Sequence, residues 1–186
     1  MKILFSLTYY TPYVSGLTLY VKRLGEALAK NGDKVSILTN LHQRNLRQEE
    51  IINNVKIQRA KPLLKISKGF LSIEWIFNSW QQARDSDAII ISLPQFEGVW
   101  PALFGKLFGK KIVTIYHCEV KLPDSILNSL IERVLNFSNF ITLSLSDTVI
   151  TYTEDFARSS KLLKPFSNKL KYRQSTPRSI SRKINQ

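Results

Sequence analysis

Cysteine and histidine are nearly absent from this chain of 186 residues, which has one cysteine, Cys118, and two histidines, His42 and His117. A lone cysteine excludes an internal disulfide, and three such side chains cannot complete a four-ligand zinc site of cysteine and histidine. We therefore expect no structural metal and no cofactor.

Long apolar runs are also missing. Uncharged apolar stretches such as residues 88–96 and 134–146 fall well short of the roughly 20 apolar residues that span a bilayer. The apolar run at residues 3–7 is too short for the core of a signal peptide. The length and a hydrophobic content of 44% are sufficient for one substantial core. The sequence therefore predicts a cytoplasmic protein with one main domain.

Acidic residues are missing from the last part of the chain, where most of the net charge of +13 arises. Residues 158–186 carry nine basic groups and no acid, whereas residues 1–157 carry 18 basic and 14 acidic groups. We expect residues 172–186 to form a disordered basic tail, separate from a domain at residues 1–171, because the tail has too few apolar side chains to offset the entropy lost on ordering. Its charge predicts nonspecific attraction to anionic surfaces, including the inner face of the membrane. Specific nucleic-acid binding is not expected, since Tyr172 is the tail's one aromatic residue.

Apolar strands alternate with amphipathic helices along the rest of the chain. Strands are predicted at residues 2–7, 34–39, 55–59, 88–93, 111–116 and 148–151, and helices at residues 17–30, 71–84, 96–108 and 124–145. The helix at residues 71–84 is expected to bury Ile73, Trp75, Ile76 and Trp80. Alternating elements with strands apolar on both faces indicate an α/β fold with a Rossmann-like parallel sheet and helices on both faces.

Ligands of such open sheets bind outside the carboxyl ends of the strands, where the strand order reverses. If the first strand and the strand at residues 88–93 flank that point, the site is formed by the loops at residues 8–16, 94–98 and 117–121. Pro94 and Gln95 are therefore candidate substrate-binding residues.

Phosphate-binding motifs are absent: neither G-x-G-x-x-G nor a P-loop occurs, and the segment from Gly105 to Lys110 is predicted to be a helix-ending turn. Gly16 opens a helix, whose free backbone N–H groups attract anions, although a plain turn is the simpler interpretation.

Three consecutive residues, His117, Cys118 and Glu119, follow the strand at residues 111–116. The histidine can be a structural hydrogen-bonding residue, or it can bind substrate hydroxyls or accept a proton. Cys118 is predicted to be a small apolar filler, because a neighbouring carboxylate raises the pKa of a thiol and disfavours a nucleophile.

Four segments together resemble a known family. They are P-Y-V-S-G-L (12–17), A-L-A-K-N-G-D-K-V-S-I-L-T (27–39), Y-H-C-E-V-K-L-P (116–123) and D-T-V-I-T-Y-T-E-D-F-A (147–157). Over about residues 1–171 the chain resembles the amino-terminal domain of family 4 glycosyltransferases. The resemblance implies one half of a GT-B fold, in which the first domain holds the acceptor, the second binds the nucleotide-sugar donor, and the sugar is transferred with retention.

The resemblance also assigns roles to residues. His117 matches the histidine that reaches the transferred sugar and is the predicted catalytic residue. Gly16 matches a glycine near the donor phosphates, with Ser15 where the family usually has another glycine. Ser15, Gly16 and Glu119 join Pro94 and Gln95 as predicted substrate-binding residues.

The family's second domain has no counterpart after Lys171, and none of the eight glutamates forms the E-x7-E spacing of that domain. The resemblance therefore implies that the chain is one of the two domains of a hexosyltransferase and is inactive alone. It would bind a nucleotide sugar only together with a complementary donor domain, and its acceptor would be a glycan or lipid. Alternatives stay open. The first is a noncatalytic glycan- or membrane-binding module, or one subunit of a split glycosyltransferase. The second is a basic nucleotide- or nucleic-acid-binding protein.

Overall fold

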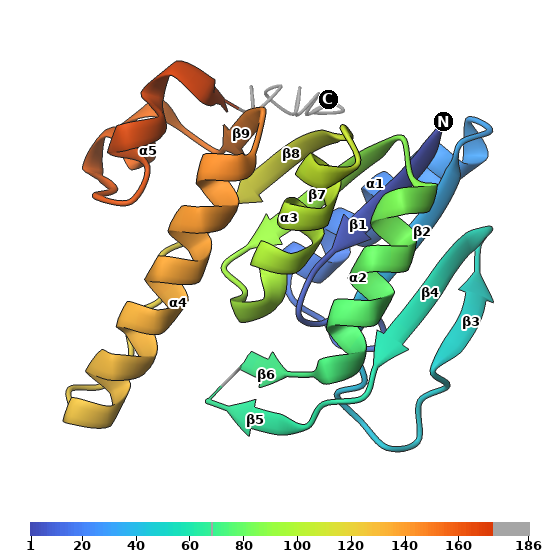
Figure 1. Cartoon of the computed structure of the whole chain (residues 1–186), viewed down its shortest axis with the longest axis horizontal. Helices are drawn as coiled ribbons and strands as arrows, with labels where there is room; N and C mark the ends of the chain where they lie inside the picture. The colour runs from blue at the N-terminus through green and yellow to red at the C-terminus, as the bar shows by residue number, and fades with distance from the viewer. Residues whose placement is uncertain (68, 173–186) are drawn as a thin grey trace, which may run out of the picture.

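An eight-stranded sheet runs through the protein in the order β10-β9-β8-β7-β1-β2-β4-β3 (Figure 1). The structure is a computed structural model that describes residues 1–67 and 69–172. The strands are β1 (Lys2–Ser6), β2 (Lys34–Asn40), β3 (Glu49–Ile52), β4 (Val55–Ala60), β7 (Ala88–Leu93), β8 (Lys111–Tyr116), β9 (Thr148–Thr151) and β10 (Leu170–Tyr172). Neighbouring strands are parallel except β3, which is antiparallel to β4. The predicted α/β fold with a Rossmann-like parallel sheet is confirmed.

The strand order reverses between β1 and β7. From β1 the sheet continues through β2 to β4 in one direction, and from β7 through β8 and β9 to β10 in the other. β1 pairs directly with both β2 and β7. The predicted switch point is therefore confirmed, and the carboxyl ends of β1, β7 and β8 come together there.

Helix α1 (Gly16–Lys30) covers one face of the sheet, behind the strands in Figure 1. It begins where predicted because Ser15 caps it: the Ser15 Oγ accepts a hydrogen bond from Thr18 N at 3.2 Å, and the Thr18 Oγ1 accepts one from Ser15 N at 2.8 Å. The helix ends before Gly32, whose φ is +93°. The core on this side contains Ile3, Phe5, Val21, Val35, Ile37, Val55 and Ile57.

Helices α2 (Ile73–Asp85), α3 (Val99–Leu107) and α4 (Ile126–Leu145) cover the opposite face, in front of the sheet in Figure 1. Because side chains alternate along a strand, Leu4 of β1 joins this second core, while its neighbours Ile3 and Phe5 join the first. The second core is larger and includes Leu38, Trp75, Ile89, Ile91, Ala102, Ile112, Leu143 and Val149.

Several short elements were not predicted. They are β3, β10, a two-stranded hairpin of β5 (Leu64–Ile66) and β6 (Gly69–Leu71), helix α5 (Glu154–Ser159), and the 3-10 helices η1 (Phe96–Gly98) and η2 (Lys164–Lys169). Each is too short to show a hydrophobic period of its own. The chain turns from β3 into β4 through Asn53 and Asn54, whose φ angles are 50° and 64°. η1 occupies the start of the helix predicted at residues 96–108.

The predicted buried side of α2 was partly wrong. Trp75 is fully buried, but Ile73 and Trp80 are exposed, and Ser79 and Ala83 complete the buried face instead. The two small side chains share the buried side of α2 with Trp75, whereas Trp80 packs on Phe104 of α3 and on Phe108 just after that helix.

No helix within residues 1–67 and 69–172 is long and apolar enough to cross a membrane. β10 ends at Tyr172, and the rest of the basic tail predicted for residues 172–186 lies outside the described residues.

Candidate functional site

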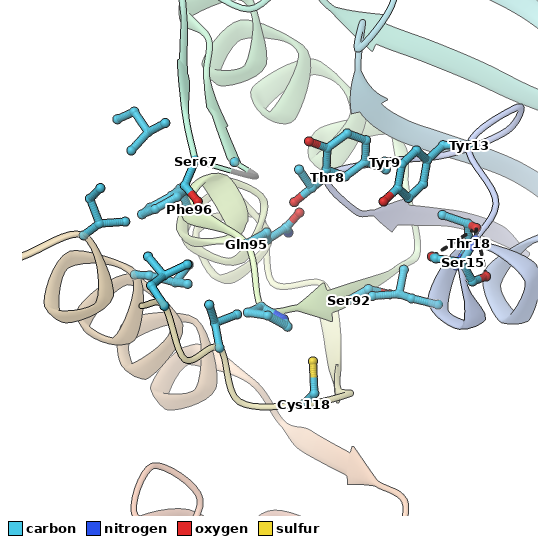
Figure 2. Close-up of a pocket in the computed structure, with 18 residues that line it drawn as sticks. Thr8, Tyr9, Tyr13, Ser15, Thr18, Ser67, Ser92, Gln95, Phe96 and Cys118 are labelled. Atoms are coloured by element: carbon cyan, nitrogen blue, oxygen red, sulfur yellow. Dashed lines mark hydrogen bonds between the residues drawn. The ribbon is translucent and has the colours of Figure 1, made fainter. Parts of the chain in front are cut away.

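A pocket of about 240 Å³ opens at the carboxyl ends of β1, β7 and β8 (Figure 2). It lies where the strand order reverses, as the sequence predicted. In Figure 2, Tyr9 and Tyr13 lie side by side at one edge and Cys118 lies at the opposite edge. The lining residues come from the loop after β1, the hairpin β5–β6, the loop after β7, the loop after β8 and α4: Thr8, Tyr9, Tyr13, Ser15, Leu17, Thr18, Ile66, Ser67, Gly69, Ser92, Pro94, Gln95, Phe96, Cys118, Val120, Leu122, Ile131 and Leu135.

Two of the residues that line this largely apolar pocket carry a buried polar atom. The Ser92 Oγ and the Gln95 Oε1 find no hydrogen-bond partner among the described residues. Gln95 is held in place by its other groups, since its Nε2 donates to the Ser6 Oγ at 2.9 Å and its backbone N–H donates to the Asn139 Oδ1 at 3.3 Å. Buried polar atoms normally have partners, so these two are suited to hydrogen-bond a ligand.

An aromatic cluster forms one wall. The rings of Tyr9 and Tyr13 stack at 4.5 Å between centroids, while His42 and Phe70 meet the Tyr9 ring edge-on at 5.6 and 5.3 Å. Burial, followed by the nearby Tyr13, raises the pKa of Tyr9, which keeps the phenol neutral. Flat, partly exposed aromatic rings can stack on the apolar face of a sugar. This wall was not predicted, although Tyr9, Tyr10 and Tyr13 stand close together in the loop.

Glycine shapes the back of the pocket at Gly98. A Cβ placed there would lie 2.9 Å from the Gln95 Nε2 and 3.2 Å from the Leu93 Cδ2. The tight packing of Gln95 against the backbone therefore requires glycine at this position.

A buried carboxyl group lies directly behind the loop that carries Gln95. Glu97 is 4% exposed, and its oxygens accept hydrogen bonds from Ser72 N at 2.6 Å and from the Asn40 Nδ2 at 3.0 Å. Burial raises the pKa of Glu97 to about 7, although both hydrogen bonds favour the charged form. Glu97 thus joins the ends of β2 and β7 to the start of α2, and it stabilises the pocket without lining it.

The predicted substrate-binding residues are only partly brought together. Ser15, Pro94 and Gln95 line the pocket. Gly16 opens α1 beside it, exposed and with open space around its Cα, as an anion site would require. Glu119 is exposed and does not belong to the lining.

His117 lies at the end of β8, outside the pocket lining. Its Nδ1 is 2.8 Å from the Tyr152 hydroxyl, its ring meets Tyr20 of α1 at 6.0 Å, and its backbone N–H donates to Leu93 O at 3.0 Å. This geometry is compatible with both a structural and a substrate-binding role for His117, because the Tyr152 hydroxyl orients the ring in either case. Its catalytic role stays a prediction.

Cys118 was expected to fill a core position, but it is exposed and lines the pocket. Partial burial of the thiol raises the pKa of Cys118, so the thiol stays protonated and is a poor nucleophile. Within residues 1–67 and 69–172, no three His, Cys, Asp or Glu side chains gather closely enough to hold a metal ion.

A comparison with sequence models of protein families identifies the family of this chain. The sequence model of glycosyltransferase family 4 matches residues 14–170. The chain belongs to glycosyltransferase family 4. A search of curated protein sequences finds no match.

Solved GT-B glycosyltransferases share the fold of this family 4 domain. Sucrose-phosphate synthase from Thermosynechococcus elongatus superposes with a TM-score of 0.57 at 17% identity, covering 84% of this chain and 44% of that one. The catalytic domain of starch synthase IV from Arabidopsis thaliana, bound to ADP and acarbose, superposes with a TM-score of 0.53 at 14% identity, covering 91% of this chain and 50% of that one. The chain therefore corresponds to one GT-B domain and spans about half the length of these enzymes.

Proposed function

We propose that this family 4 domain is the acceptor side of a retaining glycosyltransferase. A complementary domain would bind the nucleotide sugar, and the pocket of Figure 2 would hold the acceptor, a glycan or a lipid-linked sugar. Without that complementary domain the chain would not catalyse transfer. The proposal rests chiefly on the pocket at the switch point, whose apolar walls carry two buried polar groups without partners among the described residues.

The polar groups and the tyrosines suit different parts of an acceptor. Gln95 and Ser92 can hydrogen-bond sugar hydroxyls, and the Tyr9–Tyr13 pair can stack on a pyranose ring. Leu122, Ile131 and Leu135 extend the lining with apolar surface, which favours an acceptor that carries an apolar group next to its sugar.

The donor side of the reaction is expected to depend on two positions at the ends of the loops that form the pocket. Gly16 presents the free N–H groups of α1, where a phosphate of the donor can approach. His117, oriented by Tyr152, would hydrogen-bond the transferred sugar. Neither position offers contacts for a nucleobase or a ribose, so those contacts are assigned to the complementary domain.

Replacement of His117 tests this division of labour. In an enzyme reconstituted from this chain and a family 4 donor domain, His117→Ala should lower kcat by roughly ten- to a thousandfold, because a positioned hydrogen bond to the reacting sugar is lost. Tyr152→Phe, which removes only the hydroxyl that contacts the His117 ring, should have a smaller effect in the same direction.

Glu49→Gln is the control, since Glu49 is exposed on the edge strand β3 and outside the pocket lining, and it should leave kcat within about twofold. Full activity of His117→Ala, or a gross loss of its helical circular dichroism signal, would assign His117 a structural role.

A noncatalytic glycan-binding module is the second candidate, favoured by the exposed Tyr13 ring stacked on Tyr9. Sugar transfer by the reconstituted pair excludes it. Glycan binding to this chain, with no transfer in the presence of any complementary domain tried, supports it.

A further inference from the structure

Helix α4 has a second apolar face that is largely exposed, with Phe166 packed on Phe140 at its carboxyl end. Its large apolar side chains Ile126, Leu127, Leu130, Val134, Phe137 and Phe140 are exposed, with 93% exposure at Ile126 and 68% at Phe137. We call these six residues the α4 stripe. They recur mostly at spacings of three and four, so they share one side of the helix.

The α4 stripe is distinct from the side of α4 that packs on the protein. Leu135, Asn139, Thr142 and Leu143 are buried against the sheet and its neighbours, about half a turn away from the stripe. A contiguous exposed apolar surface of this kind is uncommon on a monomer and indicates an interaction surface.

Basic residues lie along the α4 stripe and beyond its carboxyl end, whereas the exposed Asp124 precedes its amino end. Arg133 is exposed beside it, and Glu132, the one acidic residue of α4, is half-buried and accepts a hydrogen bond from Leu122 N. At the carboxyl end of α4, the Phe166 ring lies 5.2 Å from Phe140, and the Lys169 Nζ donates to Ser144 O at 2.7 Å.

These last contacts attach a basic segment to the end of the stripe. Residues 158–171 hold five basic residues and no acid, and they lie next to the carboxyl end of α4 (Figure 1). Lys161 and Lys164 of this segment are exposed. An apolar helix face bordered by lysine and arginine is the pattern of helices that lie in the interface of an anionic membrane.

We propose that the α4 stripe docks this protein on an anionic lipid bilayer. A second copy of the chain is the less favourable occupant, because residues 1–172 carry 23 basic and 14 acidic groups and pairing two stripes would also bring two basic segments together. Anionic lipid headgroups instead complement that charge, while the acyl region takes up the apolar side chains.

Docking on α4 places the pocket at the membrane surface. Ile131 and Leu135, on another side of the same helix, line the pocket, so the stripe and the pocket are separated by the width of one helix. An acceptor with an apolar chain could then reach the pocket while that chain stays in the bilayer. The docking itself does not rest on the proposed glycosyl transfer, and its test contains neither donor nor acceptor.

Flotation of the full chain with lipid vesicles tests the docking. Vesicles of phosphatidylglycerol and phosphatidylcholine should carry the protein upward at about 0.15 M salt, and pure phosphatidylcholine should carry much less. The double variant Leu130→Ser/Phe137→Ser should partition at least about tenfold more weakly onto the anionic vesicles, because it removes two inserted apolar side chains.

The matched control is Leu19→Ser/Ile51→Ser, which also removes two exposed apolar side chains, one on α1 and one on the edge strand β3. It should partition within about twofold of the original protein. Both variants keep residues 173–186, so a difference between them reports on α4. All four positions are exposed, and thermal melting checks that each variant folds.

Removing charge gives a second readout. Lys161→Gln/Lys164→Gln should weaken binding to anionic vesicles by about fivefold per lysine and leave binding to neutral vesicles unchanged. The proposal is overturned if the original protein does not bind anionic vesicles, or if the α4 double variant binds them as well as the control does. It is also overturned if light scattering finds a dimer that the α4 double variant dissociates, because the stripe is then a protein interface.

Discussion

The two helix layers of this domain differ on their outer surfaces. α1 carries one exposed large apolar residue, Leu19, among Lys22, Arg23, Glu26 and Lys30. Of the 21 such residues within residues 1–67 and 69–172, the opposite layer carries eleven: Ile73, Phe77 and Trp80 of α2, Leu103 and Leu107 of α3, and the six of the α4 stripe. A helix that only covers a sheet needs one apolar face, as α1 has. The second apolar surface of the α2–α4 layer therefore points to an interaction outside this domain.

The two faces of the sheet also differ in how a buried charged side chain is stabilised. Arg59 is buried on the strand β4 and binds the Glu50 carboxylate at 2.5 Å and the carbonyls of Arg47 and Thr11, each at 2.8 Å. Glu97 is buried beside the start of α2, and its partners in the structure are an amide and a backbone N–H. A buried charge with an opposite charge beside it keeps its charge, whereas one held by neutral donors alone is neutralised more easily.

A pair of glycines gives the largest expected difference between the two layers. At Gly105 of α3 a Cβ would lie 2.7 Å from the Ile89 Cδ1 and 3.2 Å from Ile112, whereas at Gly25 of α1 it would make an ordinary 3.6 Å contact with Val35. Gly105→Ala should lower the free energy of unfolding by about 2 kcal/mol through overpacking. Gly25→Ala should raise it by about 0.5–1 kcal/mol, because alanine favours the helix.

Urea denaturation of the two alanine variants measures this difference directly. Both substitutions add one methyl group to a buried helical glycine, so each is the control for the other. Equal effects of the two would mean that α3 is not packed more closely on the sheet than α1 is.

A smaller effect is expected from pH at Glu97. Its folded pKa of about 7 lies above the unfolded value, so the folded state binds more protons and stability falls as the pH rises from about 4.5 to 7. Glu97→Gln keeps an acceptor for Ser72 N and removes this titration. Relative to the original protein, the variant should gain about 2 kcal/mol, or several degrees in Tm, between pH 5 and pH 8.

Melting curves at several pH values test this, with Glu74→Gln as the control for the loss of a carboxylate at the same end of α2. Glu74 accepts hydrogen bonds from Lys61 N and Gln48 at the surface. A Glu97→Gln variant whose Tm follows the same pH dependence as the original protein would show that Glu97 is already ionised at pH 5.

Much of the fold was predictable because its signals are local. The apolar runs of β1, β2, β7 and β8 and the caps at Ser15 and Gly32 each depend on a few consecutive residues. The switch point followed from general rules of open parallel sheets. Pro94 and Gln95 were predicted from this geometry, and Ser15 from the family resemblance; all three line the pocket.

Other features depend on contacts between distant segments and left no local signal. Glu97 interacts with Asn40 and Ser72, 57 and 25 residues away, so its burial cannot be read from the residues around it. Trp75 and Trp80 have the same apolar character in the sequence, but they lie on different sides of α2, so Trp75 is buried while Trp80 is exposed beside Phe104 and Phe108.

The central claim is that the pocket binds an acceptor and not the nucleotide sugar, and an NMR titration of the full chain tests it most directly. Octyl glucoside, a sugar with an apolar chain, is added below its micelle concentration, and UDP-glucose is added to a separate sample. The Gln95 side-chain amide and the ring signals of Tyr9 and Tyr13 should shift with the glycoside and stay unchanged with UDP-glucose. Micromolar binding of UDP-glucose that shifts the same signals, with none from the glycoside, would contradict the account.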